Sequence, residues 1–271
     1  MCFLELDAAE VDRHPDALTG IFAGRLTGMV IRGAFPREAL AAVVGRLEHG
    51  DFGLQSQRSA QFQGESYGRV LITEDRDLGV YFHEAARFRA ACAELFAGGP
   101  DFQARVEELL TAVAGGRTVR VPMGGDDRPY APATIRGLRA GGQIDLHCEN
   151  ETVDFPSMWH LSRLIHARNQ LSYYVMLGPA ESGGELVVHN ARHAEGPGAL
   201  LARMERSGPA VLQALSAYGQ VVPHTDVGDL LVFDSGRYFH RVTAVTGEKV
   251  RWTMGGFLAR SLDERVVYYW S

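Results

Sequence analysis

The chain has 271 residues, 46% hydrophobic and 22% charged, a composition that is typical of a folded protein and excludes long disordered stretches. Its formal net charge of -6 provides no basic field for a polyphosphate backbone, so we expect no nucleic acid partner. The acidic N-terminus does not match a signal peptide, and no segment reaches the roughly 18 apolar residues of a membrane span. Three cysteines without paired spacing fit reduced thiols in a reducing compartment. Together, these features predict a cytoplasmic protein that does not bind a membrane.

The N-terminal third, residues 1–116, has mainly helical patterns after one short predicted strand over residues 28–35. Three helices are predicted, over residues 38–47, 81–96 and 102–113. Residues 51–68 are polar and lack apolar periodicity, which predicts a long loop of the kind that often forms a lid. We therefore expect this third of the chain to supply helical support and a lid.

From residue 117 onward, short β-rich runs alternate with clusters of Gly, Pro, Asp and Asn. Strands are predicted over residues 118–122, 133–138, 143–147, 171–177, 185–189, 229–233, 241–245 and 250–257. Eight strands suit a double-sheet jelly roll. The Gly-led turns at 182–184 and 246–249 are interpreted as hairpin connections.

Residues 191–220 interrupt this β region with helical patterns over 199–204 and 210–218, and we interpret them as an insertion. The sequence thus predicts one mainly β domain over residues 1–271, with flanking helices and a jelly-roll core over residues 117–260.

A candidate metal site begins at His147 and Glu149, which are two residues apart at the end of a predicted strand. In extended backbone both side chains point to the same face, while Cys148 points to the other. An imidazole and a carboxylate from one strand supply two of the three ligands of a facial triad, the site that holds Fe(II) in non-haem oxygenases. His240, at the end of the buried-looking segment 228–240, is the best candidate for the third ligand.

A candidate clamp for a carboxylate follows eleven residues after His240. Arg251 opens the last core strand, and its planar guanidinium suits bidentate binding of a carboxylate. Thr253 faces the same way, because side chains two residues apart share one face of a strand. The pair suits the far carboxylate of 2-oxoglutarate, whose keto acid end would chelate the iron.

With these residues in this order and spacing, the sequence resembles the 2-oxoglutarate and Fe(II)-dependent oxygenases, and within them the prolyl-hydroxylase-like branch. The resemblance covers roughly half of the chain, in three blocks: residues 136–149; residues 171–177 with 182–187; and residues 228–233, 240–245 and 251–257. It implies a double-stranded β-helix with supporting N-terminal helices, and an enzyme that uses Fe(II), 2-oxoglutarate and O2.

The resemblance also implies a role for each matching residue. It assigns the iron to His147, Glu149 and His240. It assigns the far carboxylate of 2-oxoglutarate to Arg251, with Thr253 as a hydrogen-bonding neighbour and Tyr173 as a residue that lines the pocket.

The chain departs from the family pattern at Glu149, where most members have Asp. The length and the helical N-terminal third also resemble the branch that hydroxylates or halogenates free amino acids. In the iron halogenases a halide takes the place of the carboxylate ligand, and here Glu149 fills that place. We therefore expect hydroxylation of an unactivated carbon, with desaturation or cyclisation requiring only a different substrate pose.

The expected substrate is a small polar molecule, such as a free amino acid or a natural-product intermediate, with a peptide as the alternative. Residues 51–68 and 150–168 are polar and are predicted to line its pocket.

Three alternatives stay open at the level of sequence. His224 is a second candidate for the third metal ligand. A cupin-like protein that binds a metal or a small molecule without turnover would share the fold, but it has no need of the clamp formed by Arg251 and Thr253. A zinc hydrolase also suits a His, Glu and His set, although the sequence offers no obvious separate base.

Overall fold

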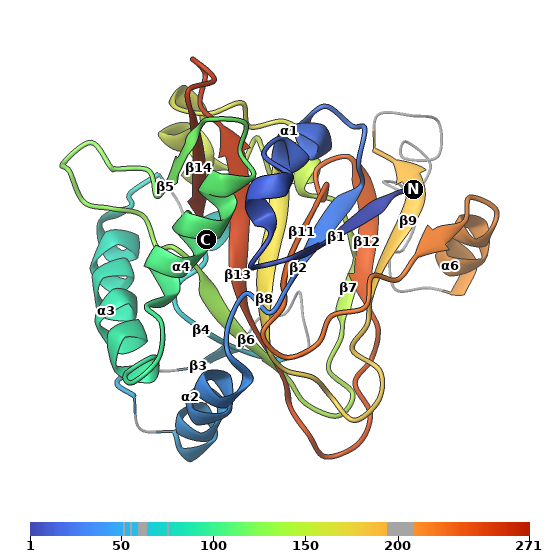
Figure 1. Ribbon diagram of the computed structural model, residues 1–271, viewed down its shortest axis with the longest axis horizontal. Helices are drawn as coiled ribbons and strands as arrows, with labels where there is room; N and C mark the ends of the chain where they lie inside the picture. The colour runs from blue at the N-terminus through green and yellow to red at the C-terminus, as the bar shows by residue number, and fades with distance from the viewer. Residues whose placement is uncertain (51, 55, 59–63, 75, 194–208) are drawn as a thin grey trace.

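Two β-sheets form the centre of the protein in the computed structural model, which describes residues 1–271 except 51, 55, 59–63, 75 and 194–208 (Figure 1). Among the described residues, the larger sheet has ten strands: β1 (Phe3–Asp7), β2 (Gly28–Arg32), β11 (Leu230–Phe233), β8 (Leu171–Gly178), β13 (Arg251–Arg260), β6 (Thr134–Leu138), β4 (Glu65–Tyr67) and β3 (Ser56–Arg58) in spatial order, with β14 (Val266–Trp270) and β5 (Thr118–Arg120) attached beside β13. The smaller sheet has four: β10 (Gln220–Val221), β9 (Leu186–Arg192), β12 (Tyr238–Val242) and β7 (Ile144–His147).

This arrangement confirms the predicted jelly roll with flanking helices, and the two sheets do not close into a continuous barrel. Two details of the prediction were wrong. The turns at 182–184 and 246–249 are not hairpins, because β8 and β9 lie in different sheets, as do β12 and β13. The strand predicted over 241–245 begins earlier, at Tyr238, so His240 lies inside β12.

The described part of the N-terminal third contains the three expected helices and one further helix, α1, together with four strands, three of which the sequence pattern did not reveal. The helices are α1 (Ala17–Phe22), α2 (Arg37–His49), α3 (Gly79–Leu95) and α4 (Phe102–Ala112), with short 3-10 turns η1 (Val11–Arg13) and η2 (Leu71–Thr73). The predicted strand at 28–35 is β2, and β1 extends the sheet beside it.

The predicted loop at 51–68 was only partly correct. Its described residues include β3 and β4, and β4 pairs with β6 at the edge of the larger sheet. Each of these two strands has 3 residues, too few to give a periodic signal. Residues 51, 55 and 59–63 of the predicted lid lie outside the described part of the chain.

The helices α2, α3 and α4 pack against the larger sheet through one apolar face each. In α2, Leu40, Val43 and Leu47 are buried at helical spacing, and the helix ends at Gly50, whose φ of 78° is left-handed. These side chains join the main hydrophobic core with α3, α4 and the larger sheet (Figure 1). A second apolar cluster lies between the two sheets and includes Leu138, Leu186, Phe233 and Val242. The candidate site lies beside this second cluster.

The predicted insertion contains α6 (Pro209–Ser216), which lies against the outer face of the smaller sheet. Val211 and Leu215 of α6 pack with Leu146 and Cys148 of the strand that leads to the candidate site. The helix predicted over 199–204 lies outside the described residues.

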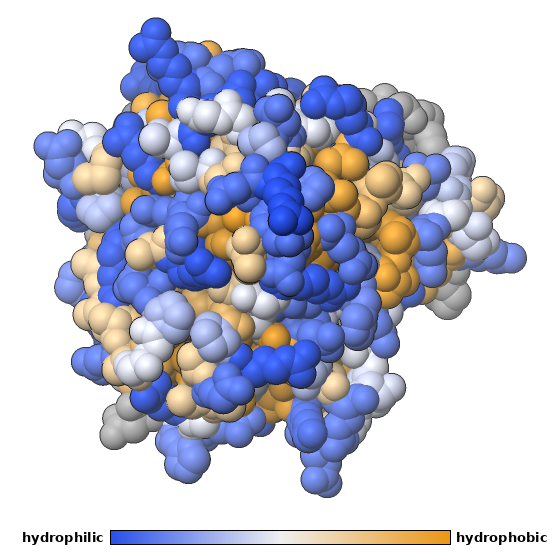
Figure 2. Space-filling model, viewed as in Figure 1, coloured by the Kyte–Doolittle hydropathy of each residue, from blue (hydrophilic) through white to orange (hydrophobic). Residues whose placement is uncertain are grey.

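The face of the molecule in Figure 2 is mainly hydrophilic, with smaller hydrophobic areas between the polar side chains. No helix in the described part of the chain is long and apolar enough to cross a membrane.

Candidate metal centre

The two histidines of the site are brought together by strand pairing in the smaller sheet. His147 ends β7, His240 lies in β12, and the two residues are direct partners in the antiparallel register. Partners in such a register point to the same side of the sheet. Their ring centroids are therefore only 4.2 Å apart, although the residues are distant in sequence.

Glu149 reaches the same point although β7 has already ended. Cys148 keeps extended backbone angles, φ -149° and ψ 132°, and Glu149 then begins the 3-10 helix η3 (Glu149–Glu151). The alternation predicted from the sequence holds, because the thiol of Cys148 turns away and donates to the Gly236 carbonyl at 2.9 Å.

The backbone of Glu149 is held from both sides. Its N–H donates to the Ser235 carbonyl at 3.1 Å, and its carbonyl accepts from the Gln170 side chain at 3.3 Å. The chain continues through two further 3-10 turns, η4 (Pro156–Trp159) and η5 (Leu161–Arg163), before it enters β8.

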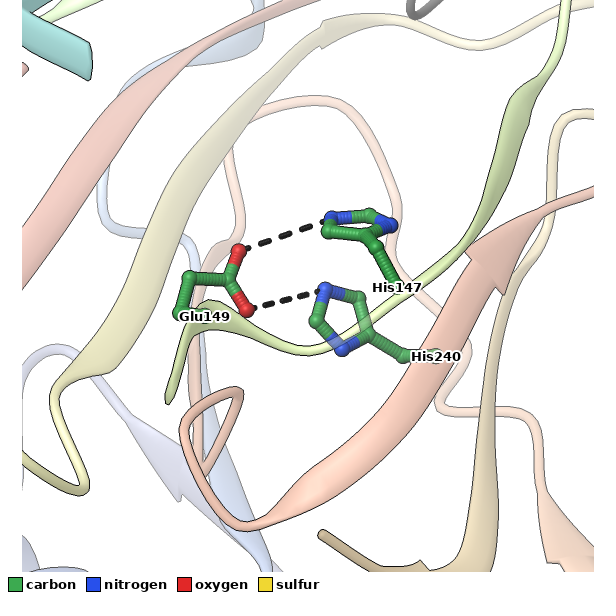
Figure 3. A group of neighbouring side chains, drawn as sticks. All are labelled: His147, Glu149 and His240. Atoms are coloured by element: carbon green, nitrogen blue, oxygen red, sulfur yellow. Dashed lines mark ion pairs between the residues drawn. The ribbon is translucent and has the colours of Figure 1, made fainter. Parts of the chain in front are cut away.

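The donor atoms face one another in a geometry that suits a cation (Figure 3). His147 Nε2 lies 3.5 Å from Glu149 Oε1, and His240 Nε2 lies 3.4 Å from Glu149 Oε2. All three ligand atoms lie within 4.8 Å of one another, and no other group of this kind occurs among the described residues.

The hydrogen bonds of the imidazoles fix which nitrogens can bind a metal. Nδ1 of His147 lies 2.7 Å from the Asp145 carbonyl, and Nδ1 of His240 lies 3.0 Å from the Tyr238 carbonyl. Because a carbonyl oxygen only accepts, each Nδ1 carries the proton, and in a neutral ring Nε2 keeps a free lone pair.

Two Nε2 lone pairs that face a carboxylate offer three donor atoms to a cation. Glu149 is buried, and its Oε2 atom has no hydrogen-bond partner in the described structure. The residues therefore fit a divalent metal, and two histidines with one carboxylate are the donor set typical of non-haem Fe(II).

The pKa of Glu149 in the protein without metal shows that positive charge nearby stabilises its carboxylate. Burial would raise the pKa of Glu149, but the imidazoles of His240 and His147 hold it well below its usual range. Burial is the strongest single influence on His147 and opposes its protonation, but the charge of Glu149 together with the hydrogen bonds to Glu149 and to the Asp145 carbonyl outweighs it and raises the pKa of His147.

Ser172 holds one oxygen of the Glu149 carboxylate and is itself in contact with Ser235. Ser172, in β8, donates to Glu149 Oε1 at 3.3 Å and lies 2.8 Å from the Ser235 hydroxyl. Oε2 lies 3.4 Å from His240 Nε2 and has no hydrogen-bond partner among the described residues. Neither serine was singled out from the sequence.

Arg251 and Thr253 line the same cavity as the three candidate ligands. Both are buried on β13, with Arg251 only 3% exposed. Burial lowers the pKa of Arg251, and its Nε atom has no partner within the described residues. Gly184 makes room for this side chain, since a Cβ there would lie 2.7 Å from Arg251 Cδ. A buried guanidinium that opens into a cavity suits an anionic ligand.

Tyr173 also borders the cavity, but its side chain lies in the main core. Its hydroxyl donates to the Pro132 carbonyl at 2.5 Å. Tyr174 faces the cavity instead, because it pairs with Gly255 on the cavity-facing side of β13. The guanidinium of Arg251 lies over the Tyr174 ring, 5.4 Å from its centroid.

The remaining sequence candidates lie elsewhere. His224 has a side chain that is 76% exposed, and it lies 3.5 Å from Asp226, outside the ligand group. The segment at 150–168 contributes to a surface groove of about 730 Å³ that shares no lining residue with the cavity of the candidate ligands.

The whole chain, residues 1–271, matches the family model described as carrier-protein-independent halogenase WelO5. The chain belongs to this family. WelO5-family membership makes the protein an enzyme of the Fe(II) and 2-oxoglutarate-dependent oxygenase superfamily, with iron and 2-oxoglutarate as cofactors. This result confirms the resemblance that was drawn from the sequence and sets aside the cupin-like binder and the zinc hydrolase. No curated protein matches the chain.

Two solved structures of one enzyme share the fold of this WelO5-family protein. An N-substituted L-amino acid dioxygenase from Burkholderia ambifaria has a TM-score of 0.55 and 17% identity, over 96% of this chain and 91% of that chain. The complex of that enzyme with α-ketoglutarate has a TM-score of 0.53 and 17% identity, over 96% and 90%. A Pseudomonas putida prolyl-4-hydroxylase has a TM-score of 0.49 and 13% identity, over 90% and 98%.

Proposed function

We propose that this WelO5-family protein is a hydroxylase that oxidises an unactivated carbon of a small polar substrate, such as a free amino acid or a natural-product intermediate. The observation that carries the proposal is the buried carboxylate of Glu149, whose Oε1 lies 3.5 Å from His147 Nε2 and whose Oε2 lies 3.4 Å from His240 Nε2. In a halogenase of this superfamily the halide would need that position.

In this proposal His147, Glu149 and His240 hold the iron, and Arg251 with Thr253 binds the far carboxylate of 2-oxoglutarate. Iron and 2-oxoglutarate, when bound, supply the oxidising power for attack on a carbon–hydrogen bond. The carboxylate of Glu149 balances part of the metal charge, and Ser172 fixes its orientation. Apolar residues of the wall, including Phe233, Val242 and Phe257, limit the access of water.

His147 marks the open side of the proposed centre, since 34% of its side chain is exposed while His240 and Glu149 are buried. A substrate would approach from this side. The proposed role of Tyr173 is limited to the wall of the cavity, because its hydroxyl is engaged with Pro132.

Halogenation is the second candidate, because the matching family model is described as a halogenase. Chloride would have to displace Glu149, at the cost of leaving a buried carboxylate without its cation. Hydroxylation requires no such rearrangement and is the function we favour.

The test is turnover with Fe(II), 2-oxoglutarate and a panel of free amino acids in the presence of chloride. Succinate formation identifies the substrate, and mass spectrometry identifies the product. We expect the mass of one added oxygen. A chlorinated main product would contradict the proposal.

A further inference from the structure

The turn at residues 234–237 joins β11 of the larger sheet to β12 of the smaller sheet, and His240 follows it in β12. The same turn holds Glu149. The Ser235 carbonyl accepts the Glu149 N–H at 3.1 Å, and the Ser235 hydroxyl lies 2.8 Å from that of Ser172, which donates to Glu149 Oε1 at 3.3 Å. Two of the three candidate ligands therefore depend on where this turn lies.

The turn packs closely against the segment that enters β8. The Gly236 N–H donates to the Gln170 carbonyl at 2.9 Å, and the Gly236 carbonyl accepts from the Cys148 thiol at 2.9 Å. A Cβ at Gly236 would lie 2.6 Å from the Asn169 Cα atom, so a side chain there would push the two segments apart. Gln170 also donates to the Glu149 carbonyl at 3.3 Å. The turn, the segment before β8 and the ligand loop thus form one packed unit.

An ion pair inside the turn links this unit to α1. Asp234 is buried, and its carboxylate pairs with the guanidinium of Arg237 and accepts the Arg237 backbone N–H at 3.1 Å. The guanidinium also donates to the last residues of α1, to the Phe22 carbonyl at 2.7 Å and the Ile21 carbonyl at 3.3 Å. Carbonyls at the C-terminal end of a helix attract a cation. The Asp234 N–H donates to the Thr27 carbonyl at 2.9 Å, in the segment that follows α1.

This ion pair is largely removed from water, because Asp234 is buried and Arg237 is partly buried. Removing one partner of such a pair leaves a buried charge without compensation, which is far more unfavourable than losing an exposed pair. Without Arg237, the Asp234 carboxylate would have to turn to other donors or take up a proton. Either change shifts the adjacent residue, Ser235, and with it the contacts to Glu149.

We propose that Arg237 is a positioning residue of the metal centre, which fixes the turn at 234–237 and, through Ser235, the orientation of the Glu149 carboxylate. This inference rests on the proposed role of Glu149 as a metal ligand. It adds a residue that does not line the cavity, and it gives α1 a part in metal binding.

A purely structural role for Arg237 makes a different prediction. If the guanidinium only stabilises the end of α1 and compensates Asp234, its loss lowers the stability of the fold but leaves the metal affinity of the folded protein unchanged. If it positions Glu149, its loss weakens the metal affinity of protein that is still folded.

The other end of β11 provides a matched control. Arg32 pairs with the buried Asp229 at 2.6 Å and donates to the His224 carbonyl at 3.1 Å. The Arg32 side chain is 27% exposed, against 23% for Arg237, so the two pairs have similar burial. Neither Arg32 nor Asp229 lines the cavity. Arg32→Gln therefore removes a similar ion pair and leaves the turn at 234–237 with its contacts.

The experiment measures Fe(II) binding by anaerobic calorimetry, with urea unfolding as the measure of stability. The variants are Arg237→Gln, Arg237→Lys and the control Arg32→Gln, and circular dichroism checks that each is folded before titration. Arg237→Lys keeps the positive charge beside Asp234. A His147→Ala variant, which lacks a proposed ligand, shows whether the metal binds at this centre.

We expect Arg237→Gln to raise the Kd for Fe(II) about tenfold to hundredfold, the usual effect of losing a supporting partner of a metal ligand. Arg237→Lys should raise it less, because the ammonium still pairs with Asp234. Arg32→Gln should lower the stability but keep the Kd of the unmodified protein. The visible spectrum of bound Co(II), which depends on ligand geometry, should change in Arg237→Gln and stay the same in Arg32→Gln.

An Fe(II) affinity and a Co(II) spectrum that are unchanged in Arg237→Gln would overturn the proposal, as would an equal loss of affinity in Arg32→Gln. If Arg237→Gln does not fold, Arg237→Lys is compared with Arg32→Lys, and equal Fe(II) affinities of these two variants would overturn the proposal in the same way. Unchanged Fe(II) binding by His147→Ala would instead refute the proposed metal centre itself, and the positioning role with it.

Discussion

Replacing Arg251 with alanine tests whether the buried guanidinium of β13 is the binding group for 2-oxoglutarate. Arg251 is 3% exposed and opens into the cavity, so a carboxylate bound there is removed from water. Truncating one partner of such a desolvated charged pair costs about 2–5 kcal/mol, whereas an exposed pair contributes about 0–1 kcal/mol. We therefore expect the Kd for 2-oxoglutarate to rise at least about 30-fold.

The assay is anaerobic calorimetry of the Fe(II)-loaded protein, with metal affinity measured separately. Arg260→Ala is the matched control, because Arg260 ends the same strand, pairs with Glu264 at 3.0 Å and does not line the cavity. Metal binding should be nearly unchanged in both variants. An unchanged Kd for 2-oxoglutarate in Arg251→Ala would refute the assignment and place the clamp elsewhere.

Two further predictions concern Glu149 and the buried His189. Ser172→Ala removes the 3.3 Å hydrogen bond to Glu149 Oε1, and loss of such a supporting contact should weaken Fe(II) binding about tenfold or more in a metal titration. The control is Ser162→Ala, because the Ser162 hydroxyl donates to the Trp159 carbonyl. An equal loss of Fe(II) affinity in Ser162→Ala would argue against a positioning role for Ser172. His189 is buried with both ring nitrogens unpartnered in the described part of the chain, and burial lowers its pKa to about 4. The unfolded state then binds the proton of His189 more tightly than the folded state, so acidification favours unfolding. Between pH 7 and pH 5, the free energy of unfolding should fall by about 2 kcal/mol more in the unmodified protein than in His189→Gln. Urea unfolding with the same pH dependence in both proteins would contradict this prediction.

The pair His147 and Glu149 could be predicted because its signal is local. A two-residue spacing fixes the shared side of His147 and Glu149 as long as Cys148 stays extended, and it does so even though β7 ends at His147. The direct pairing of His147 with His240 was not visible in the sequence, because it depends on the register between β7 and β12.

Strand register also decides which of two successive tyrosines of β8, Tyr173 or Tyr174, faces the cavity, and the sequence does not reveal it. Alternation requires that one of them faces the cavity and the other the core, but it does not say which. The pairing of Tyr174 with Gly255 decides it, and that register is set by contacts between β8 and β13 that are far apart in sequence. Arg136 also lines the cavity and was missed for a related reason, since only its pairing with Thr253 places it there.

The edge strands β3 and β4 were missed because they are short and polar, so their structure depends on pairing with β6 and not on their own pattern. In contrast, the amphipathic helices α2 and α4 were predicted well, because each carries its apolar spacing and its end signals within a few turns.

In the proposed centre, Glu149 occupies the position on iron that a halide would need. X-ray absorption at the iron edge tests it directly, on protein loaded anaerobically with Fe(II) and 2-oxoglutarate in high chloride. Glu149→Gly, which vacates the position, serves as the comparison. We predict only nitrogen and oxygen neighbours of iron in the unmodified protein, whereas a chloride neighbour in place of the Glu149 oxygen would contradict the proposed hydroxylase.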